Sequence, residues 1–152
     1  MKALFLIPAV IIILLAVVLL RACLVKPTAA KEAKMPPVDP ERCRKYAETL
    51  SEMIKTETVS DRDNYDVTKY YRYHEKLREL FPLVFEKLEI TDIDGNLIAR
   101  WKGKSPDGAV LFMSHQDVVP AEGNWTHAPF SGVIEDGKVW GRGAMDTKCS
   151  AL

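Results

Sequence analysis

The sequence predicts a layered α/β domain preceded by a transmembrane helix, and three observations lead to this fold class. An uncharged apolar run extends from Ala3 to Leu20. Apolar residues recur at helical spacing between residues 39 and 81, and from Leu88 the period changes to two. Helices followed by a buried strand and by hairpins are typical of a layered α/β domain.

The apolar run "ALFLIPAVIIILLAVVLL" indicates a membrane segment. At about 1.5 Å per residue it reaches roughly 27 Å, close to the hydrocarbon thickness of a bilayer. The run is longer than the apolar part of a usual signal peptide, and no small-x-small cleavage site follows it cleanly. We therefore expect residues 1–24 to be an uncleaved, single-pass signal anchor rather than a cleaved signal peptide.

Composition changes after the anchor. Residues 25–40 are rich in Lys, Ala, Pro and Glu without apolar periodicity, which predicts a linker. Residues 41–152 then remain for a single soluble domain. The whole chain balances 21 basic against 21 acidic residues, so no basic field attracts nucleic acid. Cys23 and Cys43 form neither a metal-binding nor a disulfide pattern.

The soluble part begins with a well-marked helix. Asp39 can cap it, Pro40 suits the first helical position, and Glu41 suits the positive end of the helix dipole. One face of this helix is expected to be apolar, and it comprises Cys43, Tyr46, Ala47, Leu50, Met53 and Ile54.

A second helix is predicted from about Val67 to Phe81, where Pro82 ends or restarts it. Its inward stripe comprises Tyr70, Tyr73, His74, Leu77 and Phe81. We interpret this stripe, including His74, as core packing.

Period-two patterns follow. Two strands are expected about the Asp94-Gly95-Asn96 turn, and another hairpin about Asp136-Gly137. Between them, Ala109 to Met113 form a continuous apolar run, which predicts a strand covered on both faces.

Candidate chemistry lies where this strand ends. His115 and Asp117 are two residues apart, so on extended chain they face the same way and the carboxylate can orient the imidazole. A strand-end histidine is also a common structural residue. Asp146 follows a predicted strand at Lys138 to Trp140 and a Gly-Arg-Gly loop, which brings it to the same sheet edge.

The glycine-rich loop before Asp146 lacks the spacing of a phosphate-binding motif, and Asp146 would repel an anion. A histidine and two acids instead suit a divalent cation, with Zn²⁺ the leading candidate. Two direct ligands do not complete such a site. His127 and Trp125 lie on a polar loop that we expect to rim the site, with His127 facing solvent.

Three stretches together resemble a known family: "YAETLSEMIKTETVS", "LFMSHQDVVPA" and "WTHAPFSGVIEDGKVWGRGAMDTK". They are similar to the opening of the zinc-dependent metallopeptidases that include aminoacylase, carboxypeptidase S, acetylornithine deacetylase and succinyl-diaminopimelate desuccinylase. The resemblance covers nearly everything after the linker. It implies that the soluble part is the N-terminal, incomplete part of a zinc-peptidase catalytic domain.

The resemblance assigns roles to three residues. It implies that His115 binds one metal, that Asp146 bridges two metals, and that Asp117 is the catalytic-site carboxylate orienting His115. A shared cation places the His115 nitrogen and the Asp146 oxygen roughly 3–3.5 Å apart, with the Asp117 carboxylate about 2.7–3.0 Å from the other ring nitrogen. The cofactor implied is a pair of Zn²⁺ ions, with Co²⁺ or Mn²⁺ as alternatives, and the Asp146–Thr147 peptide is expected to be cis.

Other parts of the implied site are not among these 152 residues. The family resemblance implies a later Glu-Glu pair that supplies the general base and a ligand, further ligands, and an inserted lid domain. We therefore expect residues 1–152 to be inactive by themselves. Cys149 stands where the family commonly has glycine, as a tolerated small residue or, alternatively, a soft ligand or thiolate nucleophile.

The resulting hypothesis is a metal-dependent hydrolase of amide bonds, of the carboxypeptidase or N-acyl amino acid hydrolase type. The expected substrates are small peptides or N-acyl amino acids, and the N-terminal helix is the contact with the membrane. The family resemblance implies an extracytoplasmic domain, whereas the count of Lys and Arg around the apolar run favours the cytoplasm. The alternative function is a non-catalytic, membrane-tethered binding module with a partial hydrolase fold. The oligomeric state is left open.

Overall fold

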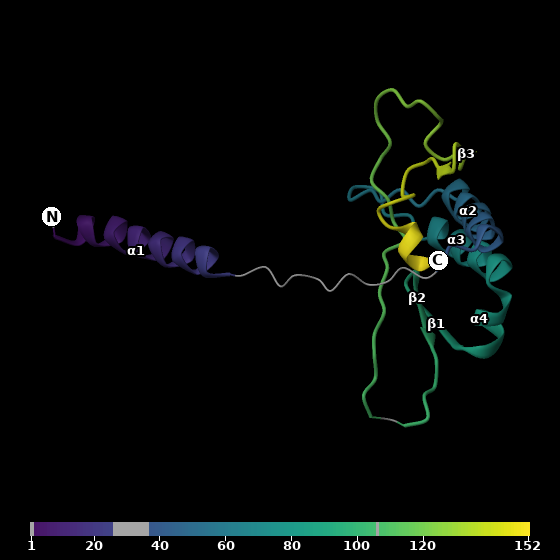
Figure 1. Cartoon of the computed structure of the whole chain (residues 1–152), viewed down its shortest axis with the longest axis horizontal. Helices are drawn as coiled ribbons and strands as arrows, with labels where there is room; N and C mark the ends of the chain where they lie inside the picture. The colour runs from purple at the N-terminus through teal and green to yellow at the C-terminus, as the bar shows by residue number, and fades with distance from the viewer. Residues whose placement is uncertain (1, 26–36, 106) are drawn as a thin grey trace. The chain divides into compact units, whose positions relative to one another are not determined.

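The computed structural model describes residues 2–25, 37–105 and 107–152. These residues form two compact units, Met1–Pro37 and Val38–Leu152. Most of the predicted linker, residues 26–36, lies outside the described residues. Figure 1 labels the helices and strands of both units.

The first unit contains a long apolar helix, α1 (Lys2–Leu24), with Pro8 inside it. Residues Ile7–Leu24 are long and apolar enough to cross a membrane, and a signal sequence near the N-terminus would have the same character. The predicted helix is therefore present, and its length and composition fit both an anchor and a signal sequence.

Helix α2 (Pro40–Lys55) begins as the sequence predicts. The Asp39 carboxylate accepts hydrogen bonds from the backbone N–H groups of Glu41 at 3.0 Å and Arg42 at 3.2 Å, which satisfies donors that the first turn leaves unpaired. Only the second half of the predicted apolar face is buried. Cys43 and Tyr46 are exposed, because the elements that pack on α2 cover it from Leu50 onward.

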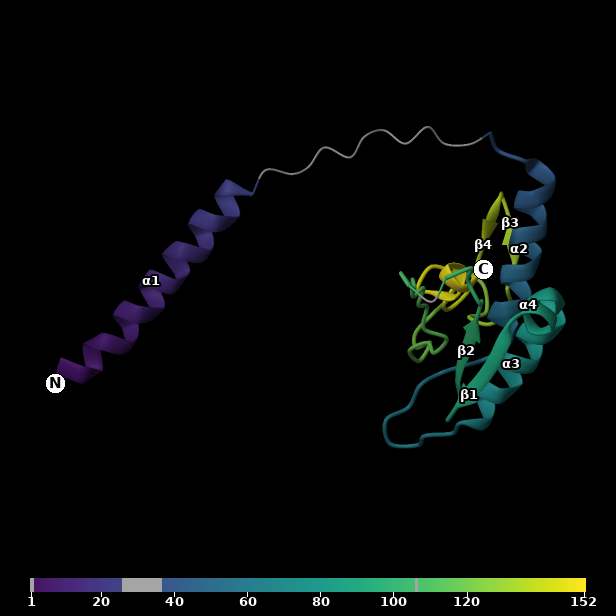
Figure 2. The same cartoon turned by 90° about the horizontal axis from the view of Figure 1, so that it is seen from below.

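Helices α3 (Thr68–Leu80) and α4 (Pro82–Lys87) follow, and Pro82 restarts the helix. Tyr70, Tyr73 and His74 are buried, which confirms the first three of the five residues of the predicted stripe. Figure 2 shows α3 beside α2. The core lies between these two helices, where Met53, Ile54 and Tyr73 are almost completely removed from solvent.

Both predicted hairpins are confirmed. Strands β1 (Glu89–Ile93) and β2 (Asn96–Arg100) pair antiparallel, as do β3 (Ile134–Glu135) and β4 (Lys138–Val139). The Asp-Gly pair in each turn has positive φ at both residues, which matches the twist of a tight hairpin. The Ser51 hydroxyl donates to the Gly132 carbonyl at 2.6 Å and so ties the chain before β3 to α2.

The prediction of a buried strand at Ala109 to Met113 is wrong for this chain. The segment is not a strand, and its side chains are exposed, with Phe112 at 90%. A central strand is covered only where neighbours pair with both of its edges, and the described residues place their strands in two separate two-stranded sheets. The chain after β2 accordingly runs as an extended trace in Figure 1.

The described part of the second unit is therefore mixed helix and strand, as predicted, without a central layered sheet. A short 3₁₀ helix, η1 (Lys148–Ala151), ends the chain directly after the glycine-rich loop.

Candidate metal centre

The structure brings together the three residues that the sequence singles out. The His115 Nε2 atom lies 3.0 Å from the Asp146 Oδ1 atom, although the two residues are 31 positions apart in sequence. The His115 Nδ1 atom lies 3.2 Å from the Asp117 Oδ1 atom and 3.0 Å from the Asp117 backbone oxygen. The carboxylate contact is thus slightly longer than expected, because the carbonyl of the same residue is the nearer acceptor.

This cluster is open to solvent. The side chains of His115 and Asp117 are about half exposed and that of Asp146 is almost fully exposed. The hydrogen bond to Asp146 raises the pKa of His115 above its ordinary value, with smaller contributions from the Asp117 backbone and from both carboxylates, and partial burial opposes the shift. Negative charge around the imidazole therefore favours a positive species at this position, either a proton or a cation.

The backbone of residues 58–60 holds the segment that carries His115 and Asp117. Val118 donates its N–H to the Thr58 carbonyl at 3.0 Å and accepts from the Ser60 N–H at 2.9 Å. These bonds form a single parallel bridge between Val59 and Val118. The Thr58 hydroxyl also donates to the Gln116 carbonyl at 2.5 Å. Residues 116–118 are therefore held against the core by these bonds, whereas the apolar run before them, residues 109–113, is exposed.

Two glycines let the loop before Asp146 approach the core closely. A Cβ at Gly141 would lie 2.5 Å from the Ile54 Cγ2 atom, and a Cβ at Gly143 would lie 2.7 Å from the Val118 Cγ1 atom. Gly143 also has φ +84°, a conformation that other residues rarely adopt. Both glycines are thus required for packing, and Gly143 places the Asp146 loop directly against the residue that follows Asp117.

Lys148 anchors the other side of this loop. Its side chain is completely buried, and its Nζ donates to the carbonyls of Met53 at 2.9 Å and Thr56 at 2.7 Å, at the C-terminal end of α2. The Nζ also lies 4.6 Å from the centre of the Tyr73 ring. Carbonyl oxygens at a helix C-terminus carry partial negative charge and suit a cation. Burial nevertheless lowers the pKa of Lys148 from 10.5 to about 8.

The peptide between Asp146 and Thr147 is cis, as the family resemblance implies. The Thr147 carbonyl that follows it accepts a hydrogen bond from the Ser114 hydroxyl at 3.2 Å. Ser114 precedes His115 in the chain, so this bond connects the two candidate ligand segments a second time.

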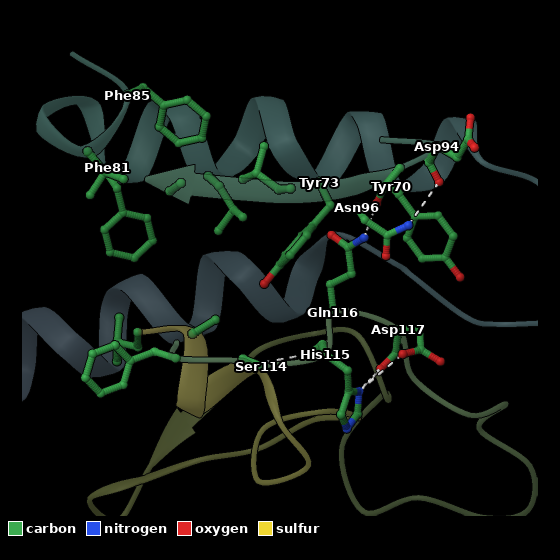
Figure 3. A pocket seen from close by; sticks show the side chains of 18 of the residues that line it. Tyr70, Tyr73, Phe81, Phe85, Asp94, Asn96, Ser114, His115, Gln116 and Asp117 are labelled. Atoms are coloured by element: carbon green, nitrogen blue, oxygen red, sulfur yellow. Dashed lines mark hydrogen bonds and ion pairs between the residues drawn. The ribbon is translucent and has the colours of Figure 1, made fainter. Parts of the chain in front are cut away.

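A cavity of about 570 Å³ lies beside the cluster, between α3, the β1–β2 turn and residues 112–117. Aromatic side chains dominate its wall, as Figure 3 shows for Tyr70, Tyr73, Phe81 and Phe85. His115 and Asp117 lie at its edge in the same figure, with the contacts between them drawn as dashed lines.

The residues present fit part of a metal site. An imidazole nitrogen and a carboxylate oxygen 3.0 Å apart can both approach one divalent cation at about 2.0–2.2 Å, and both atom types are ordinary zinc ligands. Within the described ranges, however, no group of three or more His, Cys, Asp or Glu side chains is arranged to hold a metal. The geometry is therefore compatible with two direct ligands, His115 and Asp146, and with Asp117 as an orienting acid.

The other candidates from the sequence make different contacts. His127 does not face solvent as expected: its side chain is 21% exposed, it lies 3.2 Å from a carboxylate oxygen of Glu135, and its ring packs 5.0 Å from that of Trp140. The Trp125 ring packs against the Arg142 guanidinium at 4.8 Å. The Cys149 thiol donates to the Met145 carbonyl at 3.2 Å.

Sequence reasoning missed Gln116 and Lys148. Gln116 stands between His115 and Asp117, so strand alternation already places it on the opposite face. Nothing local marks Lys148, because a lysine near a helix start is usually solvated. Its buried position depends on the packing of α2 against η1.

Comparisons with known proteins agree with the resemblance. Residues 111–152 match the family described as Peptidase family M20/M25/M40. A carboxypeptidase S-like protein of Dictyostelium discoideum is 37% identical over 105 residues, which cover 65% of this chain and 20% of that protein. A protein of Saccharomyces cerevisiae named as a carboxypeptidase is 33% identical over 106 residues, or 64% of this chain and 18% of that protein.

An uncharacterized carboxypeptidase of Schizosaccharomyces pombe is 34% identical over 100 residues, or 62% of this chain and 16% of that protein. The chain thus spans about a fifth of the length of the curated relatives it matches. No solved structure matches it. The resemblance to this peptidase family is confirmed, and it is consistent with an N-terminal portion.

Proposed function

We propose that residues 41–152 are the N-terminal part of the catalytic domain of a metal-dependent amide hydrolase. The observation that carries this proposal is the approach of His115 to Asp146 across 31 residues of sequence, with Asp117 on the other ring nitrogen. The match of residues 111–152 to a peptidase family, and the carboxypeptidase names of the relatives, support the same class of reaction.

Each of the three residues has a distinct task in this proposal. His115 and Asp146 supply one nitrogen and one carboxylate to the metal centre, and Asp146 has a second oxygen for a neighbouring cation. Asp117 holds the imidazole so that Nε2 faces Asp146. Bound Zn²⁺ would polarise the scissile carbonyl and lower the pKa of a bound water.

The substrate class follows the names of the relatives. We propose a carboxypeptidase or N-acyl amino acid hydrolase that acts on small peptides or N-acyl amino acids. We further propose that α1 anchors the protein in a membrane with the hydrolase domain outside the cytoplasm. Retention of the full chain in the membrane fraction after alkaline washing checks the anchor, and protease protection of the domain in intact cells would contradict this orientation.

A zinc titration tests the metal centre directly. The full chain in detergent micelles contains three histidines, so the ring resonances of His115 can be assigned and followed by NMR as Zn²⁺ is added. We expect the His115 resonances to shift with Zn²⁺. The Zn²⁺ affinity, measured by isothermal titration calorimetry because His115→Ala lacks the ring that NMR follows, should fall by at least about tenfold in His115→Ala and in Asp146→Asn, because each removes a proposed direct ligand.

His127→Ala is the matched control, because His127 contacts Glu135 and Trp140 rather than the cluster. It should bind Zn²⁺ as the unchanged chain does. Equal affinity in all four proteins, or Zn²⁺ shifts at His127 instead of His115, would refute the metal centre.

A further inference from the structure

Gln116 lies between the two candidate site residues and points away from both. Figure 3 shows its side chain running toward the β1–β2 turn, whereas His115 and Asp117 face the opposite side. Residues two apart on extended chain share a face, and the residue between them takes the other. The direction in which Gln116 is held therefore sets the direction in which His115 and Asp117 point.

The Gln116 amide is held at both ends. Its Nε2 donates to the Gly95 carbonyl in the β1–β2 turn. Because a carbonyl can only accept, this contact orients the amide and leaves its Oε1 facing His74, whose Nε2 lies 2.8 Å away. Both hydrogen-bonding functions of the side chain are thus used, one by the turn and one by α3.

The same hydrogen bonds close into a ring. The other nitrogen of His74, Nδ1, lies 2.6 Å from the Asp92 Oδ2 atom on β1. The Asp92 Oδ1 atom accepts the Gly95 N–H at 3.0 Å. A path of hydrogen bonds therefore runs from His74 to Gln116, Gly95, Asp92 and back to His74. We call these four residues the polar ring.

The polar ring is a firm anchor because its centre is buried. The His74 side chain is 5% exposed. Its Nδ1 and Nε2 atoms each lie within hydrogen-bond distance of an oxygen atom, one on Asp92 and one on Gln116. Water has little access to the buried His74 ring, and an unmade bond there leaves a ring nitrogen without a partner. The ring joins α3, the β1–β2 hairpin and the segment of His115 in one arrangement.

We propose that Gln116 is a positioning residue, whose side chain fastens the His115–Asp117 segment to His74 and Gly95 and thereby directs His115 and Asp117 toward Asp146. This inference rests on the proposed metal centre. The hydrogen bond from the Thr58 hydroxyl to the Gln116 carbonyl holds the backbone of the segment against residues 58–60. The side-chain amide of Gln116 fixes the rotation of the His115–Asp117 segment about its own axis. This rotation decides whether the His115 ring reaches Asp146.

The test compares Zn²⁺ affinity at His115 in the full chain, in detergent micelles, with that of three variants. Gln116→Met keeps the length of the side chain and removes both hydrogen bonds. Asn96→Ala is the matched control, because the Asn96 amide lines the same cavity and donates only to Ile93 and Asp94 within its own turn. Leu50→Ala, in the core, controls for general loss of stability.

We expect Gln116→Met to weaken Zn²⁺ binding by about tenfold, the loss that orienting groups around metal ligands usually cause. Asn96→Ala and Leu50→Ala should bind within about twofold of the unchanged chain at temperatures where both are folded. An equal loss in Leu50→Ala, or no loss in Gln116→Met, would overturn the positioning role.

A second readout separates this inference from the proposed function. If the unchanged chain binds no Zn²⁺ at His115, the metal centre is refuted, and the positioning role is judged on the metal-free chain. In Gln116→Met the His115 ring should become more mobile by NMR relaxation and lose its contact with Asp146. An unchanged His115 ring would refute the inference.

Discussion

Two histidines of this chain each have both ring nitrogens against oxygen atoms, one in the core and one at the surface. His74 contacts Asp92 and Gln116 with a side chain that is 5% exposed, and His115 contacts Asp117 and Asp146 with a side chain that is 50% exposed. The local chemistry is similar and the surroundings differ. The comparison shows how burial separates a structural histidine from one that is available to a ligand.

Solvent access explains the difference. In the polar ring, each bond that His74 loses leaves a polar atom of its buried ring without a partner, so the arrangement resists exchange. At the surface, water can satisfy Asp117 and Asp146 while the His115 proton is replaced by a metal. The neighbouring carboxylates raise the pKa of His115, so a metal must displace this proton and should bind more tightly as the pH rises.

The largest expected effect comes from removing each histidine in turn. His74→Leu should lower the free energy of unfolding by about 4 kcal/mol, because it removes both hydrogen bonds of a buried ring, one to Asp92 and one to Gln116. His115→Leu should change it by less than about 0.5 kcal/mol, as usual for an exposed site. Urea unfolding followed by tryptophan fluorescence measures both. Equal losses would remove the distinction between the two histidines.

The next effect concerns the contact that brings the two regions together. Gly143→Ala should destabilise the domain by about 3 kcal/mol, because its Cβ would meet Val118 and its φ is left-handed. Gly123→Ala is the control, since Gly123 has φ +82° with nothing within 4 Å, and it should cost only about 1 kcal/mol. The same unfolding assay compares them. Equal losses of unfolding free energy in the two variants would show that the close contact between Gly143 and Val118 does not contribute to stability.

Lys148 extends the comparison to a buried side chain whose ammonium, within the described residues, forms no ion pair with a carboxylate and instead donates to backbone carbonyls. Burial lowers its pKa from 10.5 to about 8, so between these values the unfolded chain binds more protons than the folded chain. The free energy of unfolding should therefore rise with pH in this window, by about 2 kcal/mol from pH 8 to about pH 9.5. Urea unfolding at several pH values measures the rise. Lys148→Met should abolish this rise in the free energy of unfolding. An identical rise in Lys148→Met would mean that other titratable groups cause it.

The smallest expected effect is on hydrolysis. We expect residues 1–152 to hydrolyse neither dipeptides nor N-acyl amino acids, with or without Zn²⁺, because these residues offer two proposed direct ligands and do not include the Glu-Glu pair that the family resemblance implies. His115→Ala should therefore leave the measured rate at background. Turnover that survives purification and disappears in His115→Ala would show that the exposed cluster is catalytic by itself.

Much of the second unit could be predicted because the signals are local. Asp39 caps α2 through atoms two and three residues away, and Pro82 restarts the helix through its own ring. The Asp-Gly turns set the hairpins through their own φ values. Residues His115, Asp117 and Asp146 were found by their positions after predicted strands and by family resemblance, and their contact was expected before the structure showed it.

The run from Ala109 to Met113 was mispredicted because burial of a strand depends on neighbours. Its apolar character is the same in a central strand and in an unpaired segment. Pairing is a long-range property, and the described residues offer the run no ladder partner. The buried face predicted for α2 was too long for a similar reason. Tyr46 has the right spacing, but no described element packs over it, and its side chain is exposed.

The sequence by itself determined the helices, caps and turns of this protein, together with the types of residue that meet at the candidate site. Tertiary structure alone decided that Gln116 joins the polar ring around the buried His74. It also decided that the Lys148 ammonium binds carbonyls at the C-terminal end of α2 and that Gly143 packs against Val118. The physical reason is range. Backbone conformation depends on neighbours a few residues away, whereas burial and polar pairing depend on which distant segments exclude water together.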